Sequence, residues 1–142
     1  MNRSSAMAIL ALAGCGAPGS AAPAGPLKFP DQPVMTLTSE SGQLEIEVRT
    51  APEQPPSRGD GSVELIIRNA TTSAPESGLS IAVVPWMPVM GHGASIVPSV
   101  ASSSPGTYVI TNVDLFMPGT WELRTTVSGS AVDHVTPSFQ IP

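Results

Sequence analysis

Cysteine and charged residues are both scarce in this chain of 142 residues. Cys15 is the one cysteine, so no intrachain disulfide can form and the fold must depend on its apolar core. Charged residues make up 12% of the chain, well below the roughly 25% usual in soluble globular proteins. Six Lys and Arg stand against eleven Asp and Glu. That balance argues against binding to nucleic acid or electrostatic docking on anionic lipid, because both depend on positive side chains.

Sequence signatures of catalysis are also missing. No serine lies in a G-x-S-x-G setting, and neither a C-x-x-C zinc spacing nor a phosphate-binding glycine loop is present. Asp133 and His134 are adjacent, so a strand would point them to opposite faces. Most other acidic residues alternate with apolar ones, as on the solvated face of a strand. We therefore predict no enzymatic activity and no small-molecule substrate.

Proline and glycine, in contrast, are abundant. The 16 prolines and 13 glycines suit short strands joined by many turns, and no window predicts an amphipathic helix. Apolar and polar residues alternate in several segments, and turn residues recur at intervals of about ten residues. This pattern predicts an all-β domain over residues 32–142, an immunoglobulin-like antiparallel β-sandwich of about seven strands. The expected strands are 43–49, 62–69, 79–84, 94–100, 107–113, 120–127 and 131–141, with a loop at 51–61.

The N-terminus has the pattern of a secretory leader. Arg3 precedes a short apolar run, 6–13, that is far too short to span a bilayer. The run ends in Leu-Ala-Gly-Cys, which resembles the lipobox of bacterial lipoproteins and makes Cys15 the lipidated first residue of the mature chain. The alternative is an ordinary signal peptide with an incidental cysteine. We predict a lipoprotein signal peptide at residues 1–14.

A tether is expected between the lipid and the folded domain. Residues 16–31 are small, uncharged over most of their length, and rich in Pro and Gly, which cannot form a core. No other stretch is long and apolar enough to be a transmembrane segment. Residue 16 is Gly and not Asp, so the inner-membrane retention signal of Gram-negative lipoproteins is absent. The expected location is the bacterial cell envelope, on the outer rather than the inner membrane of a Gram-negative cell.

The segment W-M-P-V-M-G-H-G, which begins at Trp86, contains a concentration of soft metal ligands. Thioethers and an imidazole together suit copper(I) better than zinc, calcium or magnesium. Met90 and His92 would share a face of an extended strand, and a bend at Pro88 would bring Met87 back to them. Met117 lies in a second aromatic-Met-Pro sequence, and it becomes a possible fourth ligand if the two segments meet at one end of the sandwich.

A packing role explains the same residues without a metal. Methionine fills irregular gaps in cores, and tryptophans are commonly large core residues, as Trp86 and Trp121 would be in facing sheets. Trp86 could also cap a soft cation with its ring. His92 could simply bond a loop carbonyl, while the isolated His134 is expected to be exposed. Both interpretations, a metal site and a packed turn, remain open at the level of the sequence.

Three pieces of the chain together resemble the YtkA-like domain family, with a more distant similarity to FixH. They are Met-Pro-Val-Met-Gly-His at 87–92, Gly-Thr-Tyr at 106–108 and Met-Pro-Gly-Thr-Trp at 117–121. The resemblance covers residues 34–141 and implies an immunoglobulin-like sandwich in a bacterial envelope protein. It supplies no activity, although some relatives lie near copper or cytochrome-oxidase functions. A lipobox replaces the transmembrane helix of FixH, which argues against a role inside a membrane complex.

Two hypotheses for function follow. The first is a lipid-anchored, non-enzymatic envelope module with a structural or protein-interaction role, whose partner is an unidentified envelope protein. The alternative is a domain that binds or delivers copper(I) through Met87, Met90 and His92, with Met117 as a fourth ligand. Copper(I) is the one cofactor that the sequence suggests. Besides an envelope protein, the expected partner of the chain is the membrane, which it contacts through its lipid.

Overall fold

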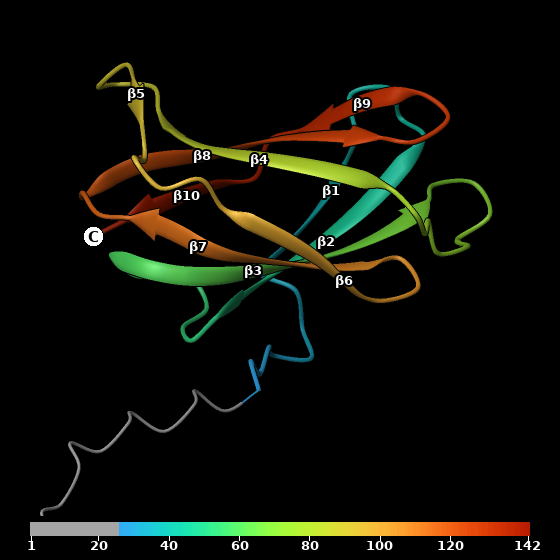
Figure 1. The fold of residues 1–142 in the computed structure, drawn as a ribbon, viewed down its shortest axis with the longest axis horizontal. Coiled ribbons are helices and arrows are strands. Elements are labelled where there is room, and N and C mark those ends of the chain that lie inside the picture. The colour runs from blue at the N-terminus through green and yellow to red at the C-terminus, as the bar shows by residue number, and fades with distance from the viewer. Residues whose placement is uncertain (1–25) are drawn as a thin grey trace, which may run out of the picture.

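Two antiparallel sheets face each other in the computed structural model, which describes residues 26–142 (Figure 1). One sheet has the strand order β1-β2-β3-β7-β6, and the other has the order β10-β8-β4-β5 with β9 also paired to β8. The strands are β1 (Met35–Thr38), β2 (Leu44–Ala51), β3 (Gly59–Asn69), β4 (Ser80–Met87), β5 (His92–Gly93), β6 (Ser99–Ser104), β7 (Thr107–Leu115), β8 (Gly119–Ser128), β9 (Val132–Val135) and β10 (Ser138–Ile141). The predicted all-β sandwich is confirmed.

The core lies between the two sheets and follows the alternation in the sequence. In β8, for example, Trp121 and Leu123 are almost completely buried, whereas Glu122 and Arg124 face outward. The most deeply buried large side chains are Trp121, Ile46, Leu65, Ile67, Ile110 and Leu123. Each such side chain contributes about 1.5–3 kcal/mol by leaving water. Apolar burial on this scale lets the domain fold without a disulfide.

The structure differs from the sequence prediction at the short strands. No strand spans 94–100; residues 94–98 have no regular structure, and β6 begins only at Ser99. The segment 131–141 is divided into β9 and β10 on either side of Pro137, as expected for a proline that interrupts an edge strand. Strands β1 and β5 were not predicted. These two strands and the division at Pro137 raise the expected seven strands to ten.

The predicted loop at 51–61 is shorter in the structure than in the prediction. Strand β2 continues to Ala51 and β3 already begins at Gly59, where Gly59 pairs with Leu115 of β7. A change of register between Gly61 and Val63 marks a bulge in this pairing. Gly59 and Gly61 led to the prediction of a loop here, because glycine usually indicates a turn. Glycine is also common at β-bulges, so these residues can belong to a strand.

Tyr108 of β7 pins the connection between β3 and β4. Its buried hydroxyl donates a hydrogen bond to the carbonyl of Glu76 at 2.9 Å and accepts one from the N–H of Leu79 at 3.0 Å. Both partners lie just before β4 begins. The single tyrosine of the chain therefore fixes the point at which the chain crosses from one sheet to the other.

Several expectations concern residues before Pro26 and lie outside the described residues. They are the signal peptide at 1–14, the lipidated Cys15 and most of the tether at 16–31. Residues 26–34, which are described, precede the first strand and have no strand or helix. Across the described residues, no helix has the length and apolarity to cross a membrane.

Candidate functional site

Met87 and His92 lie directly opposite each other at one end of the sandwich. Met87 is the last residue of β4 and pairs with His92, the first residue of β5. Residues paired in this way share a face of the sheet and have Cβ atoms roughly 4.5–5.5 Å apart. Met87 is buried and His92 is half-buried. A thioether and an imidazole from the predicted ligand set are thus brought together.

A tight turn between these two strands places Met90. The N–H groups of Met90 and Gly91 both donate to the carbonyl of Met87, at 3.2 and 2.9 Å. Gly91 has a φ of +66°, which glycine adopts without steric cost. The bend expected at Pro88 is therefore present, but Met90 lies in the turn with 52% of its surface exposed. The expectation that Met90 and His92 share a face of an extended strand is wrong, because the chain is not extended there.

The second aromatic-Met-Pro segment meets the first at this end of the sandwich. The ring of Phe116 stacks on His92, with centroids 6.1 Å apart and planes inclined by 15°. Met117 is partly buried against the core, and its carbonyl accepts a hydrogen bond from Trp121 Nε1 at 2.9 Å. A Cβ built on Gly119 would lie 2.9 Å from Met87 Cε. The condition on which Met117 was considered as a ligand is therefore met.

The aromatic residues hold this end together as a stacked series. Phe116 contacts His92 on one side and meets Trp121 edge-on on the other, with centroids 5.4 Å apart and planes at 68°. Trp121 is completely buried, as predicted for a core residue. The Nδ1 atom of His92 lies 3.2 Å from the carbonyl oxygen of Gly93. The imidazole is thus oriented both by its own strand and by a ring from the β7–β8 connection.

Trp86 has a different role from either of those predicted. It precedes the buried Met87 in β4, so its side chain lies on the outer face of the sheet. The guanidinium of Arg124 sits over its ring, 4.8 Å from the centroid, and also bonds Glu122 at 3.0 Å. Trp86 is therefore neither a core residue nor a cap over Met87 and His92. The Arg124 guanidinium of β8 already covers its ring.

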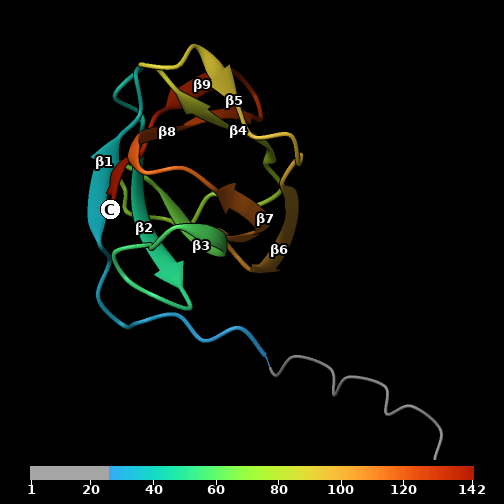
Figure 2. The same ribbon diagram turned by 90° about the vertical axis from the view of Figure 1, so that its left-hand side faces the viewer.

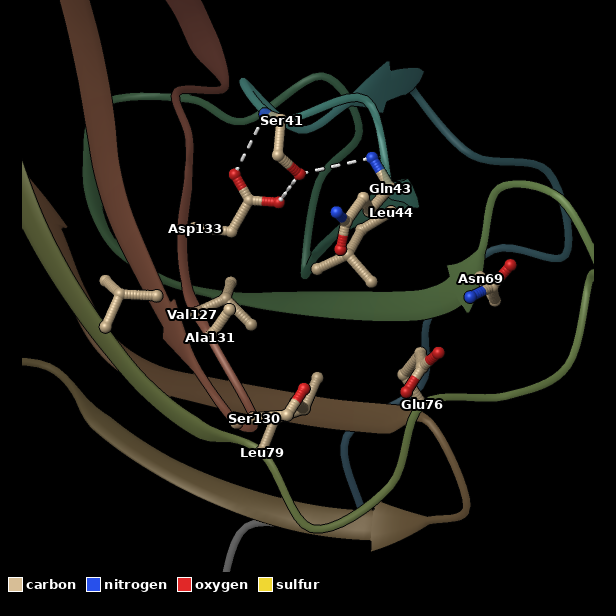
Figure 3. Close-up of a pocket in the computed structure, with 12 residues that line it drawn as sticks. Ser41, Gln43, Leu44, Asn69, Glu76, Leu79, Val127, Ser130, Ala131 and Asp133 are labelled. Carbon is tan, nitrogen blue, oxygen red and sulfur yellow. Dashed lines mark hydrogen bonds between the residues drawn. The ribbon is translucent and has the colours of Figure 1, made fainter.

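The opposite end of the sandwich contains a pocket of about 190 Å³ with a buried carboxylate beside it (Figure 3). The carboxylate of Asp133, at the start of β9, points toward Ser41 and not into the open space. Its Oδ1 accepts hydrogen bonds from the N–H groups of Ser41 at 3.1 Å and His134 at 2.9 Å, and its Oδ2 accepts the Ser41 hydroxyl. Asp133 thus ties β9 to the turn between β1 and β2.

These contacts also determine the protonation of Asp133. Burial alone would raise the pKa of the carboxyl group, because the charged form loses water. The nearby hydroxyl of Ser39 and the hydrogen bonds from the hydroxyl and N–H of Ser41 and from the N–H of His134 outweigh that effect. Together they lower the pKa of Asp133 to about 2, from 3.8.

The structural role of Asp133 was not predicted, although the sequence contains a signal for it. Asp133 is two residues before the buried Val135, and alternation places both on the inner face of β9. His134 faces outward and is exposed, as predicted, and it does not pair with the Asp133 carboxylate through its ring. Across residues 26–142, no three His, Cys, Asp or Glu side chains gather as a set of metal ligands.

Comparisons with known proteins agree with the fold. The family model described as YtkA-like matches residues 38–126, which is more than half of the chain. No curated protein matches the chain. Among solved structures, the chain is similar to a copper-bound variant of FetP from uropathogenic Escherichia coli strain F11. The identity is 10% and the TM-score 0.54, over 77% of this chain and 95% of that chain, so the likeness concerns the fold.

Proposed function

The chain belongs to the YtkA-like family, and on that premise we propose that it is a lipid-anchored, non-enzymatic domain of the bacterial envelope that binds copper(I). One observation carries the proposal: the pairing of β4 with β5 sets Met87 opposite His92, beside the segment that contains Met117. These residues come from two segments that are 25 residues or more apart in the sequence. Their approach at one end of the sandwich is a property of the fold that alternation alone would not require.

The chemistry of these side chains fits copper(I). Thioether sulfur and imidazole nitrogen are soft or borderline donors, and none of the three side chains carries a fixed negative charge that would favour harder cations. Met87, His92 and Met117 would hold the ion, and Met90 would lie at the solvent side of the site. The neighbour FetP is described as copper-bound, which supports the proposal for this chain. The protein would bind or deliver the ion and would catalyse no reaction on it.

Copper(I) titration against a chromogenic chelator tests the site directly. The chain from residue 16 onward is suitable, because all ten strands lie within 35–141. His92→Phe removes the imidazole nitrogens and keeps an aromatic ring against Phe116, so it should spare the stacking. We expect this variant to bind copper(I) at least tenfold more weakly, a loss of about 1.4 kcal/mol or more. Met117→Leu, which conserves volume, should weaken binding similarly.

His134→Phe is the matched control, because His134 is exposed on β9 and belongs to another part of the molecule. It should leave the affinity unchanged. Equal affinities for the unsubstituted chain, His92→Phe and Met117→Leu would reject the copper site. A loss in His134→Phe equal to that in His92→Phe would do the same, because it would indicate adventitious binding to any imidazole.

The lipid anchor is a separate part of the proposal. Its support is the Leu-Ala-Gly-Cys sequence and the Pro- and Gly-rich tether that follows. The full chain should fractionate with membranes and incorporate labelled palmitate, whereas Cys15→Ala should do neither. Membrane fractionation of Cys15→Ala at the level of the unsubstituted chain would overturn the anchor and leave the copper site untouched.

A structural or protein-interaction module without metal is the second candidate. The burial of Met87, 3% exposed, favours it, because a sealed sulfur can act simply as core packing. On this alternative, the stacking of His92 on Phe116 locks the β4–β5 turn. Unchanged copper(I) affinity in the ligand variants, together with a lower melting temperature in Met87→Ala and Phe116→Ala, is the result that this function predicts.

A further inference from the structure

Strand β6 (Ser99–Ser104) is an open edge of the first sheet. It pairs with β7 on one side, and no described strand pairs with its other side. Five of its six residues are exposed, and its sequence, Ser-Val-Ala-Ser-Ser-Ser, contains no charge and no proline. Such a strand presents a row of free N–H and C=O groups to another chain.

The other described edges carry the protection that β6 lacks. Strand β5 has two residues, and β1, β9 and β10 have four each. Strand β1 is also followed by Glu40, β9 contains Asp133, and the part of β4 that β5 leaves unpaired, Ser80–Pro85, contains Pro85. Short length, proline and charge are the devices by which proteins prevent pairing at sheet edges. Strand β6 is flanked by Pro98 and Pro105, but its six residues include no charge and no proline, which makes it the least protected of these edges.

The segment of chain that contains β6 has no charged side chain over a long stretch of sequence. Between Glu76 and Asp114 the chain contains no Asp, Glu, Lys or Arg. This stretch includes β4, β5, β6 and most of β7, and it also carries the exposed Ile96 and Val97, with exposed fractions of 49% and 82%. Figure 2 places β5 and β6 on the same side of the sandwich. One flank of an acidic protein is therefore neutral.

We propose that β6 pairs antiparallel with β6 of a second copy of this chain, giving a two-fold dimer in which the two five-stranded sheets become continuous. Each copy has a net charge of −5, so two copies that approach through charged faces repel each other. The β6 flank is a surface through which they can meet without opposing charges. A two-fold contact is also self-complementary, so one neutral edge serves both partners.

The register limits which residues meet. The bulge between Ser102 and Ser104 leaves Ser99–Ser102 as the regular part of β6. Ala101 pairs with Val109 of β7 and lies on the outer face, because the neighbouring pair, Val100 with Ile110, faces the core. If both cores stay on the same side of the joined sheet, Ala101 lies directly opposite Ala101 of the second copy or diagonal to it. Those two arrangements correspond to roughly 5–8 Å between side chains.

Ala101→Lys therefore tests the dimer without disturbing the core. It places two positive charges close together at the pairing edge. The carboxylate in the same row of the sheet, Glu64 of β3, lies beyond Val109 and is already paired with Arg49. In sedimentation equilibrium of the chain from residue 16 onward, we expect the unsubstituted chain to self-associate as its concentration rises. Ala101→Lys should weaken that association at least tenfold.

Thr36→Lys is the matched control. Thr36 lies exposed in β1, at the opposite edge of the same sheet, where it pairs with Glu47 on the outer face. The same charge change there should leave self-association unchanged. A monomeric unsubstituted chain up to millimolar concentration would overturn the proposal. An equal weakening by both lysines would also overturn it, because net charge and not the β6 edge would then control association.

Hydrogen exchange supplies a measurement that does not depend on a variant. Free edge amides exchange quickly, and pairing with a second strand should slow the outward amides of Ser99–Ser102 as concentration rises. The amides of β1, the other edge of this sheet, should not change. Exchange in β6 that is independent of concentration, in a sample shown by sedimentation to be dimeric, would place the interface elsewhere and reject β6 pairing.

Discussion

Asp133→Asn should destabilise the protein in a way that depends on pH. Asp133 is 9% exposed, and its carboxylate accepts hydrogen bonds from Ser41 and from the N–H of His134. The bonds from Ser41 hold β9 against the turn between β1 and β2. An asparagine at this position has a similar shape, but it can accept these bonds with only one oxygen. The NH₂ group of the asparagine would face the hydrogen-bond donors that now bond one carboxylate oxygen, so at least one buried hydrogen bond would be lost.

The contribution of the Asp133 carboxylate to the free energy of unfolding follows from its pKa. The folded state lowers that pKa from 3.8 to about 2, and each unit corresponds to about 1.4 kcal/mol. The ionised carboxylate therefore stabilises the folded state by about 2 kcal/mol. Because the folded pKa lies below the unfolded one, the whole contribution is present above pH 3.8 and is lost as the pH falls through about 2.

Chemical denaturation followed by tryptophan fluorescence measures this effect. At neutral pH, Asp133→Asn should lower the free energy of unfolding by about 2 kcal/mol, and the difference from the unsubstituted protein should narrow as the pH falls from about 4 to about 2. Asp31→Asn is the control, because Asp31 is exposed in the segment before β1 and the same atoms are changed. It should cost less than about 0.5 kcal/mol.

Two results would refute this reasoning. One is an equal loss of stability in the two variants. The other is a loss in Asp133→Asn that keeps the same size from neutral pH down to about 2. The second result would mean that the substitution acts through packing and not through the charge of the carboxylate.

Two further substitutions test other parts of the fold. Tyr108→Phe removes the hydroxyl that bridges the β3–β4 connection and should lower the free energy of unfolding by about 1–3 kcal/mol, because a buried N–H loses its acceptor. An unchanged denaturation midpoint would show that water replaces that hydroxyl. Gly119→Ala combines a φ of +127° with a contact at 2.9 Å to Met87, and should cost about 1–3 kcal/mol. Gly42→Ala, with a φ of +77° and no atom within 4 Å of the added Cβ, should cost less in the same denaturation experiment; equal losses would mean that Met87 yields freely.

The sequence predicts the long strands well because each has one face in the core and one in water. That is why β2, β7 and β8 lie close to their predicted ranges. Alternation does not locate a strand where apolar side chains do not mark a buried face. Ile96 and Val97 suggested a strand at 94–100, yet both side chains are exposed in an irregular segment. Short strands such as β5 depend on a partner from elsewhere in the chain, which alternation does not reveal.

The candidate site was predictable in its composition and only partly in its geometry. The repeated aromatic-Met-Pro sequence raised the hypothesis that two segments meet, and the stacking of Phe116 on His92 shows that they do. The direction of each side chain depended on the turn after Met87, which changes the phase of the chain. Met90 therefore lies in the turn, contrary to expectation. Trp86 faces outward, also contrary to expectation, because it alternates with the buried Met87 in β4. The distant similarity to FixH and the copper site itself stay predictions.

The strand order has a consequence for how the molecule can be assembled. Strand β3 completes its sheet with β7, and β4 completes the other with β8, so each sheet depends on residues 107–128. A growing chain that has just emerged beyond β4 has neither of these pairings available. Contacts between strands so far apart in sequence form slowly, because a long loop must close before any of them can stabilise the chain. Until β8 emerges during synthesis, β1, β2 and β3 can pair only with one another and β4 lacks its main partner, so the inner faces of these strands stay accessible to a protease or a chaperone.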